Sequence, residues 1–251
     1  AVITDGSAVL GLGNVGPLAA KPVMEGKAVL FKRFAGIDVF NIELDTQDVD
    51  EIVNTIKNIA PTFGGINLED ISAPRCFEIE KRLIDELDIP VFHDDQHGTA
   101  IIVAAGLLNA LEIQEKNFKE AKIVCAGAGS AGIATLNLLL ELGFSKDNIL
   151  LVDRNGVVSI KSENLSKEKL TFAADTDKKT LSDAIAGSDV FIGVARGNLV
   201  TQEMVKSMAK RPIIFALSNP DPEISPVDVY ACRDDVLMAT GRSDYPNQVN
   251  N

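Results

Sequence analysis

Short apolar runs alternate along this chain with stretches whose apolar residues recur every three to four positions. This alternation is typical of α/β folds, in which strands and helices follow one another and the strands form a mainly parallel sheet. The predicted strands are Ser7–Leu10, Ile37–Ile42, Gly65–Leu68, Pro90–Phe92, Lys122–Ala126, Asn148–Val152, Asp189–Val194, Ile213–Leu217 and Val236–Ala239. The predicted helices are Pro17–Phe34, Asp48–Ile59, Arg75–Leu87, Thr99–Leu111 and Ala131–Leu142.

The composition excludes several classes of protein. The 251 residues carry a formal net charge of −12, which argues against a nucleic-acid partner because phosphate backbones select clustered Lys and Arg. No apolar run approaches the ~20 residues that a membrane helix needs. The three cysteines lack C-x-x-C spacing and no secretory segment opens the sequence, so we expect a cytoplasmic protein that does not contact a membrane.

A glycine-rich string with the G-x-G-x-x-G form lies between a predicted strand and a predicted helix. In such a turn the glycines let the backbone approach a pyrophosphate, whose charge the helix N-terminus favours. Asp153 ends the next strand and would accept hydrogen bonds from ribose hydroxyls, which favours NAD, whereas Arg154 could pair with the 2′-phosphate of NADP. We predict a dinucleotide site at Gly127, Ala128, Gly129, Ser130, Ala131 and Gly132.

Gly11–Gly16 has the same form and also precedes a predicted helix. That helix opens with Pro17, and Pro22 is expected to break its early turns. We therefore interpret Gly11–Gly16 as a structural or active-site turn rather than a second nucleotide site.

Lys27 follows a glycine, but the phosphate-loop pattern fails because Lys21 stands at its first glycine position and Ala28 at its Ser/Thr position. A lysine near a bound cation and apolar walls has a lowered pKa and can act as a base. A lone lysine is more commonly a solvated surface charge. The residues alone leave both interpretations open.

Four carboxylates follow two neighbouring predicted strands: Glu69 and Asp70 come after the first, and Asp94 and Asp95 after the second. A βαβ unit makes these strands parallel, so their carboxyl ends meet at the sheet edge where α/β proteins bind ligands. Like charges crowd together at low cost only around a cation, and oxygen-only ligands favour Mg²⁺ or Mn²⁺. Solvated charges and helix caps are the alternative.

His93 and His97 flank this acidic run at a spacing that could indicate zinc. Because the segment leaves a strand and Gly98 follows at once, helical spacing is doubtful here. We expect hydrogen-bonding or packing roles for both histidines.

These patterns predict two domains. Residues 1–95 form a smaller α/β domain with the carboxylates, and residues 96–251 form a Rossmann-type domain with a doubly wound parallel sheet. The polar segment Lys161–Lys179 is predicted as a solvated surface loop. Because the chain opens on Ala1 and ends on Asn251 without a terminal signature, we expect a fragment that is incomplete at both ends.

Taken together, the motifs resemble those of the bacterial type of malic enzyme, and they follow the family order along the whole chain. The residues that carry the resemblance are Ile3–Ser7, Leu10–Gly16, Pro22–Lys27, Asn67–Asp70, His93–Thr99, Gly127–Gly132, Phe215–Pro220, Ala239–Ser243 and Asn250–Asn251.

The resemblance implies oxidative decarboxylation of L-malate to pyruvate and CO₂ with reduction of NAD or NADP. Lys27 is similar to the family's general base, and Asp94 to a neighbouring acidic residue with a supporting catalytic role. Glu69, Asp70 and Asp95 match its Mg²⁺ or Mn²⁺ ligands.

The resemblance extends to the second half and to the assembly. Gly127–Gly132, Asp153 and Arg154 match the dinucleotide site, and Asn219, Asn250 and Asn251 resemble asparagines that contact substrate or nicotinamide. A homodimer is also implied.

The family's general acid is a tyrosine that precedes the part matching Ala1, and neither Tyr230 nor Tyr245 matches it. We therefore expect residues 1–251 alone to bind cofactor and metal but to turn malate over poorly.

Three alternatives stay open. A metal-dependent oxaloacetate decarboxylase would use the carboxylates without nucleotide, whereas a simple dehydrogenase would leave them without a purpose. A non-catalytic nucleotide-sensing module would bind cofactor without turnover.

Overall fold

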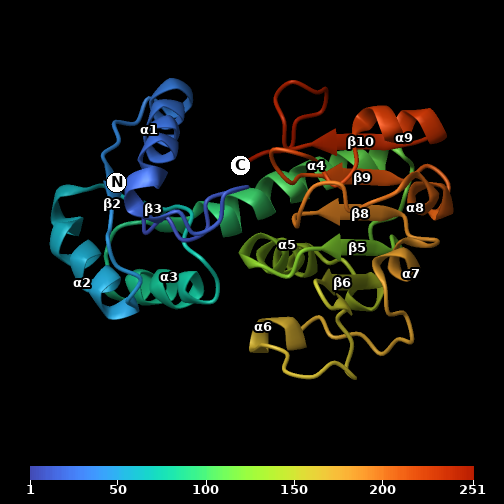
Figure 1. Ribbon diagram of the computed structural model, residues 1–251, viewed down its shortest axis with the longest axis horizontal. Helices are drawn as coiled ribbons and strands as arrows, with labels where there is room; N and C mark the ends of the chain where they lie inside the picture. The colour runs from blue at the N-terminus through green and yellow to red at the C-terminus, as the bar shows by residue number, and fades with distance from the viewer. The chain divides into compact units, whose positions relative to one another are not determined.

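The computed structural model describes residues 1–251, which form two compact units, Ala1–His97 and Gly98–Asn251 (Figure 1). The division lies two residues after the predicted boundary at Asp95. Unit 1 denotes Ala1–His97 below, and unit 2 denotes Gly98–Asn251. No helix in the structure is long and apolar enough to cross a membrane.

Unit 1 contains a parallel sheet of four strands in the order β2-β1-β3-β4. The strands are β1 (Val2–Thr4), β2 (Asn41–Glu43), β3 (Ile66–Leu68) and β4 (Val91–His93). They alternate with α1 (Gly16–Ala35), α2 (Val49–Ile59), the 3₁₀ turn η1 (Ala60–Thr62) and α3 (Arg75–Glu86). The order reverses between β1 and β3, so the carboxyl ends of these two strands form a topological switch point, the usual place for a ligand.

The core of unit 1 lies between its sheet and the helices α2 and α3, whose apolar residues recur at helical spacing. Ile52 and Ile56 of α2 and Ile79 and Leu83 of α3 are fully buried there with Leu68 of β3. In Figure 1 α1 lies on the other side of the strands from α2 and α3. The helix α3, which follows one site segment and precedes the next, is thus fixed by this core.

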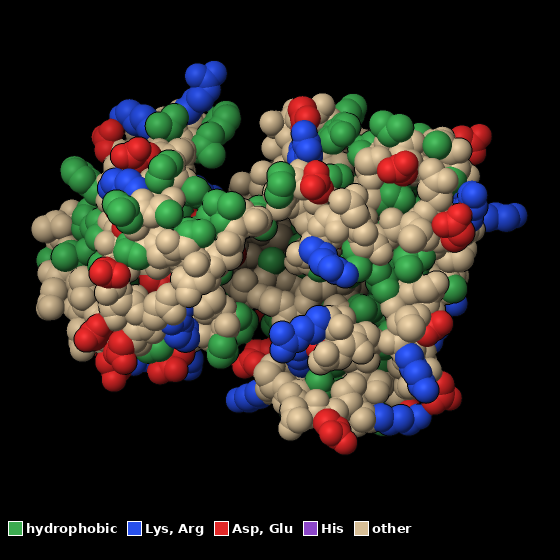
Figure 2. All heavy atoms as spheres, in the orientation of Figure 1, with side chains coloured by type: hydrophobic (Ala, Val, Ile, Leu, Met, Phe, Trp, Pro, Cys, Tyr) green, Lys and Arg blue, Asp and Glu red, His purple; other side chains and the backbone are tan.

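The helix α1 is continuous, which corrects the expectation that Pro22 breaks its early turns. Only Ala20 and Met24 of α1 are fully buried, whereas much of the helix is exposed and carries hydrophobic side chains (Figure 2). Lys27 comes seven residues after Ala20 and three residues after Met24, so it lies on the same face of the helix. The packing of Ala20 and Met24 therefore turns Lys27 toward the rest of unit 1.

The predicted strand Ser7–Leu10 is wrong, because the strand is Val2–Thr4. Gly6 adopts a left-handed φ of 65°, and the Asp5 carboxylate accepts hydrogen bonds from the backbone N–H and the hydroxyl of Ser7. These local side-chain bonds compete with strand pairing and form a turn instead. Three buried residues, Val2–Thr4, suffice for the strand because their neighbours β2 and β3 pair on both sides.

Unit 2 contains a sheet of six strands in the order β10-β9-β8-β5-β6-β7, parallel except for β7. The strands are β5 (Ile123–Ala126), β6 (Ile149–Asp153), β7 (Gly156–Val157), β8 (Val190–Gly193), β9 (Ile213–Ala216) and β10 (Leu237–Thr240). The helices are α4 (Thr99–Ile113), α5 (Ser130–Glu141), α6 (Lys167–Leu170), α7 (Leu181–Ile185), α8 (Gln202–Ser207) and α9 (Pro226–Cys232), with a 3₁₀ turn η3 (Lys146–Asn148).

Two apolar layers enclose this sheet. The first contains buried residues of α4 and α5, such as Leu107 and Leu136, and the second contains buried residues of α7, α8 and α9, such as Ile185, Val205 and Val229. Helices on both faces and an order that reverses between β5 and β8 make unit 2 a doubly wound Rossmann-type domain, as predicted.

The segment Lys161–Lys179 is only partly the solvated loop that its composition predicts. It contains α6, and Phe172 after this helix is buried in the first apolar layer. Leu165 and Ala173 pack against the same layer. A few apolar residues scattered in a charged segment were too weak a signal to predict this packing. The other predicted strands and helices are present, with ends displaced by up to four residues, whereas the short helices α7, α8 and α9 were not predicted.

Candidate active site

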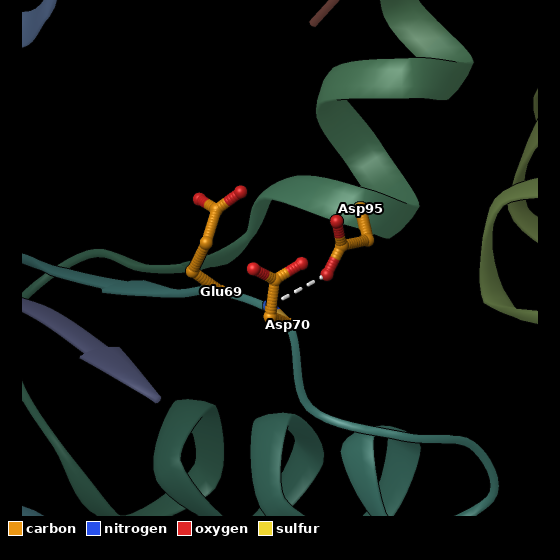
Figure 3. Close-up of side chains that lie close together, drawn as sticks. All are labelled: Glu69, Asp70 and Asp95. Carbon is orange, nitrogen blue, oxygen red and sulfur yellow. Dashed lines mark hydrogen bonds between the residues drawn. The ribbon is translucent and has the colours of Figure 1, made fainter. Parts of the chain in front are cut away.

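Carboxylates from two segments meet at the switch point of unit 1. Leu68 of β3 is paired in parallel register with His93 of β4, so the residues after both strands leave the same edge of the sheet. One carboxylate oxygen each from Glu69, Asp70 and Asp95 can be chosen so that all lie within 4.8 Å of one another. Figure 3 shows Glu69 and Asp70 at the end of β3, and Asp95 on the helical turn opposite. These three residues are called the carboxylate cluster below.

Lys27 of α1 lies against this cluster. Its Nζ is 2.6 Å from Oδ2 of Asp94 and 3.2 Å from Oε1 of Glu69, and only 16% of its side chain is exposed. A partly buried ammonium between two carboxylates is not the solvated charge of a typical surface lysine. The structure therefore brings Lys27, Asp94 and the predicted metal ligands together in unit 1.

Asp70 has an unusual backbone. Its φ is 53°, in the left-handed region that non-glycine residues rarely adopt. Its N–H donates a hydrogen bond of 2.9 Å to Oδ2 of Asp95, and its carbonyl accepts one from the N–H of Ala8. Such strain persists where surrounding contacts impose it, commonly at functional sites.

Burial and mutual repulsion raise the pKa values of the cluster. Burial, followed by the nearby charges of Asp94 and Asp95, raises the pKa of Glu69 well above its ordinary value. Burial and the charge of Asp95 raise the pKa of Asp70 to about 7, and burial raises that of Asp95 to about 6. These carboxylates carry more negative charge than the protein compensates, which is the electrostatic setting that a cation fits.

The pKa of Lys27 shifts in the direction opposite to the one expected. Burial lowers it, but the charges of Glu69 and Asp94 outweigh burial and raise it to about 12. The expectation of a lowered pKa assumed a bound cation next to Lys27, whereas the protein's own groups around Lys27 are anionic.

The two histidines take packing and hydrogen-bonding positions. His93 is fully buried, with its Nε2 3.8 Å from Oδ2 of Asp95, and burial lowers its pKa to about 4. Nε2 of His97 lies 2.8 Å from Oε1 of Glu80, whose hydrogen bond raises the pKa of His97. The group of possible metal ligands consists of carboxylates only. Its oxygen donors fit Mg²⁺ or Mn²⁺ better than zinc.

The predicted dinucleotide turn in unit 2 follows β5, at the point where the strand order reverses. A Cβ on Gly127 would lie 2.6 Å from the carbonyl oxygen of Val194, and one on Gly132 would lie 1.8 Å from that of Gly127. A Cβ on Gly129 would meet no atom within 4 Å, and its φ of −87° suits any residue. Gly127 and Gly132 are thus required by protein packing, whereas Gly129 leaves open space of the kind that a close-lying pyrophosphate needs.

A pocket beside this turn is bordered by Asp153 and by basic side chains. The carboxylate of Asp153 accepts hydrogen bonds from the N–H of Asn155 and from Nζ of Lys169, at 2.8 and 2.5 Å. The other basic residues at the pocket are Arg154, Lys179 and Arg196. Figure 2 shows Lys and Arg side chains gathered beside α6.

Asn219 lies in the segment that follows β9, and a buried glutamate holds this segment. Glu223 is fully buried and accepts the N–H of Ser218, after β9, and the N–H of Ala195, after β8, at 3.2 and 3.0 Å. Gly193 makes room for it, because a Cβ there would lie 2.4 Å from the carboxyl carbon of Glu223. Glu223 therefore fixes two loops at the carboxyl edge of the sheet.

The remaining predicted residues lie at the end of unit 2. Asn250 and Asn251 are exposed and follow Val249, whose N–H donates to the carbonyl of Thr240 at the end of β10. Tyr230 is half exposed on α9, and the ring of Tyr245 lies against the guanidinium of Arg242.

Several residues around the two sites were not predicted. They are Glu80, Glu223 and Lys169, described above, and Arg75, which donates to Asp5, Ser7 and Ser72 and so joins the segments after β1 and β3. Glu80 and Arg75 lie on a helix whose pattern indicates only an exposed polar face. The sequence offers no local signal for their partners.

Comparison with known proteins identifies the family. The family model "Malic enzyme, N-terminal domain" matches residues 1–84, and "Malic enzyme, NAD binding domain" matches residues 96–251. The chain belongs to the malic enzyme family.

Named malic enzymes from several bacteria resemble the whole chain. An NADP-dependent malic enzyme of Halomonas elongata and an NAD-dependent malic enzyme of Rhizobium meliloti are each 57% identical, over all of this chain and over 60% and 33% of their own lengths. The structure of an NAD-dependent malic enzyme from Thermotoga maritima superposes with a TM-score of 0.92 at 49% identity, covering 99% of this chain and 67% of that one. This chain thus spans one third to three fifths of the length of these two bacterial relatives.

Two glycines of the predicted dinucleotide turn of this malic enzyme chain, Gly129 and Gly132, should differ in their effects. Gly129→Ala should unfold at the same temperature as the wild type but bind NAD(P) at least about 10-fold more weakly, because the added methyl enters the ligand's space. Gly132→Ala should lose both stability and binding, since its Cβ would collide with the carbonyl of Gly127. Thermal unfolding by circular dichroism and isothermal titration with NAD⁺ and NADP⁺ measure the two effects. A Gly129→Ala variant that binds both nucleotides normally would refute the assignment.

The raised pKa values in the malic enzyme carboxylate cluster predict a pH dependence in EDTA. Between about pH 4 and about pH 7 the folded state keeps protons on Asp70 and Asp95 that the unfolded chain has released, so the free energy of unfolding falls as pH rises. The melting temperature in EDTA should therefore decrease from about pH 5 to about pH 8. Asp70→Asn/Asp95→Asn should flatten this decrease, and equal slopes for both proteins would contradict the prediction.

Proposed function

We propose that the protein to which this chain belongs catalyses the oxidative decarboxylation of L-malate to pyruvate and CO₂, with reduction of NAD(P)⁺ to NAD(P)H. The observation that carries the proposal is the placement of Lys27, whose Nζ contacts Glu69 and Asp94 directly beside the carboxylate cluster. A proton-accepting group next to an oxygen-donor cation site is what removal of hydride from a hydroxy acid requires. Membership of the malic enzyme family supports the same reaction.

Glu69, Asp70 and Asp95 would hold Mg²⁺ or Mn²⁺. When bound, the cation supplies a Lewis acid at the substrate's C2 oxygen and at the charge that develops when CO₂ departs. Their oxygen donors, burial and raised pKa values support this assignment. Asp70 and Asp95 are held relative to one another by the hydrogen bond between them, which pre-organises the ligand set.

Lys27 would take the proton of the C2 hydroxyl as hydride leaves C2. Asp94 accepts a hydrogen bond from its Nζ and fixes the direction in which this group points. The charges of Glu69 and Asp94 hold the proton on Lys27, and neutralisation of Glu69 by a ligated cation would remove part of that hold. That change would lower the pKa of Lys27 and so favour its role as the proton acceptor.

Gly127–Gly132, Asp153, Arg154 and Asn219 would bind NAD(P), while Asn219, Asn250 and Asn251 would contact the substrate. We further propose that the pocket accepts NADP. Oδ2 of Asp153 already accepts from Lys169 and Oδ1 from the N–H of Asn155, so both oxygens that would select the NAD ribose are engaged. Lys169 also adds a cation at the pocket that Arg154 borders. A 2′-phosphate needs such cations. The homodimer and the cytoplasmic location stay predictions.

Absorbance at 340 nm tests the reaction in the full-length protein, with L-malate and either Mn²⁺ or EDTA. We expect metal-dependent NAD(P)H formation with one pyruvate per NAD(P)H, and at least a ~100-fold lower kcat in Lys27→Met. Lys21→Met is the matched control, because Lys21 lies on the same helix and pairs with Glu43, away from the cluster. It should keep normal turnover.

Three outcomes would overturn the reaction. NAD(P)H formation that EDTA leaves unchanged indicates a simple dehydrogenase. CO₂ release from oxaloacetate without any malate oxidation indicates a plain decarboxylase. Nucleotide binding without turnover in the full-length protein indicates a sensing module.

Cofactor choice has its own test in Lys169→Ala. The variant should raise KM for NADP⁺ by about 10-fold or more and leave KM for NAD⁺ nearly unchanged, because only the 2′-phosphate loses a charged partner. Lys167→Ala serves as the control of equal charge, since Lys167 is exposed on the same short helix. Equal effects of Lys169→Ala on both nucleotides would rule out a 2′-phosphate contact.

A further inference from the structure

The segment that carries Asp94 and Asp95 is a short π-helix, η2 (Asp94–Gly98), between β4 and α4. A π-helical turn is rare, and such turns occur frequently at functional sites. The turn leads directly into α4 at Thr99. Side-chain contacts from outside the turn can add to this helical backbone in fixing the direction in which Asp94 and Asp95 point.

Glu80 of α3 supplies such contacts. Its Oε1 accepts the backbone N–H of His93 at 3.0 Å and lies 2.8 Å from Nε2 of His97, while its Oε2 accepts Nε2 of Gln96 at 3.1 Å. One carboxylate thus binds the residue before Asp94 and the two residues after Asp95. Both acidic residues are bracketed by these bonds.

The position of Glu80 is itself fixed. The residue is only 7% exposed, and its neighbours on α3, Ile79 and Leu83, are fully buried in the core of unit 1. Burying a carboxylate is costly unless donors compensate it, and three donors from one segment do so here. Glu80 is not part of the carboxylate cluster, so its donors account for its burial.

We propose that Glu80 is a positioning residue, which holds η2 so that Asp95 faces Glu69 and Asp70 while Asp94 faces Lys27. The proposal deepens the metal-dependent function proposed above and rests on it. Glu80 touches neither substrate nor cation. Its contribution is the placement of one ligand and of the partner of the base.

The test measures Mn²⁺ binding to the full-length protein by isothermal titration and by electron paramagnetic resonance of free Mn²⁺, without substrate. Glu80→Ala should weaken Mn²⁺ binding by about 10- to 100-fold, as loss of a hydrogen-bond partner behind metal ligands commonly does. The Kd for NAD(P)⁺, whose proposed site lies in unit 2, should stay at the wild-type value. Turnover at saturating Mn²⁺ should recover at least in part, so the KM for Mn²⁺ rises more than kcat falls.

Two further variants keep the proposal testable if Glu80→Ala does not fold. Glu80→Gln retains an acceptor and should recover part of the lost Mn²⁺ affinity. Glu78→Gln is the matched control, because Glu78 lies on the same helix with 62% of its side chain exposed. It should bind Mn²⁺ like the wild type.

Each result decides the proposal. Wild-type Mn²⁺ affinity in both Glu80 variants overturns it, as does an equal loss of Mn²⁺ and NAD(P)⁺ binding, which would indicate general destabilisation. If the wild type itself binds no Mn²⁺, the metal site fails and this proposal fails with it. Selective loss of Mn²⁺ affinity, with recovery in Glu80→Gln, supports it.

Discussion

The site in unit 1 depends on carboxylates that are buried together at the end of one sheet. Charges of the same sign repel more strongly where protein replaces water, and the raised pKa values of Glu69, Asp70 and Asp95 express this repulsion. Lys27 offsets part of it, and the N–H of Asp70 offsets another part at Asp95. The arrangement therefore stores unfavourable energy in the folded protein, which binding of a cation would release as affinity.

In both units the candidate site lies where the strand order of a parallel sheet reverses. The same glycine pattern nevertheless has a different role in each unit. Gly11–Gly16 and Gly127–Gly132 each follow the first strand of a parallel sheet at its switch point. All three pattern glycines of the first string have φ between 76° and 78°, so the turn itself demands glycine. In the second string only Gly127 has a positive φ, and Gly129 is constrained by no protein atom. Gly13 and Gly16 also have no atom within 4 Å of an added Cβ, so open space alone does not separate the two strings. The backbone conformation does, because the first string needs a left-handed φ at every pattern glycine and the second does not.

The sequence was sufficient to predict the candidate site where its residues come directly after the ends of neighbouring strands. Glu69, Asp70 and Asp95 were predicted to meet because two parallel strands with a helix between them leave no other edge. The sequence-based prediction failed where local side-chain hydrogen bonds determine the backbone conformation, as in the turn at Ser7. It also failed for contacts between distant residues, such as Glu80 with Gln96 or Lys169 with Asp153, because their partners are set by packing in three dimensions. Short segments that carry candidate metal ligands can thus be predicted, whereas the residues that orient these segments cannot.

In each of the two units, a buried glutamate orients a segment that follows a strand. Glu80 and Glu223 are both buried glutamates whose carboxylates accept hydrogen bonds at the end of a strand, where the ladder of backbone partners has stopped. A carboxylate offers about four acceptor positions, and its charge strengthens each bond to roughly 1.5–3 kcal/mol. A buried carboxylate can therefore fix a loop from its protein-facing side and leave the opposite side of the loop open to a ligand. In the proposed reaction, the geometry of the reacting groups would therefore depend on residues that do not touch the substrate.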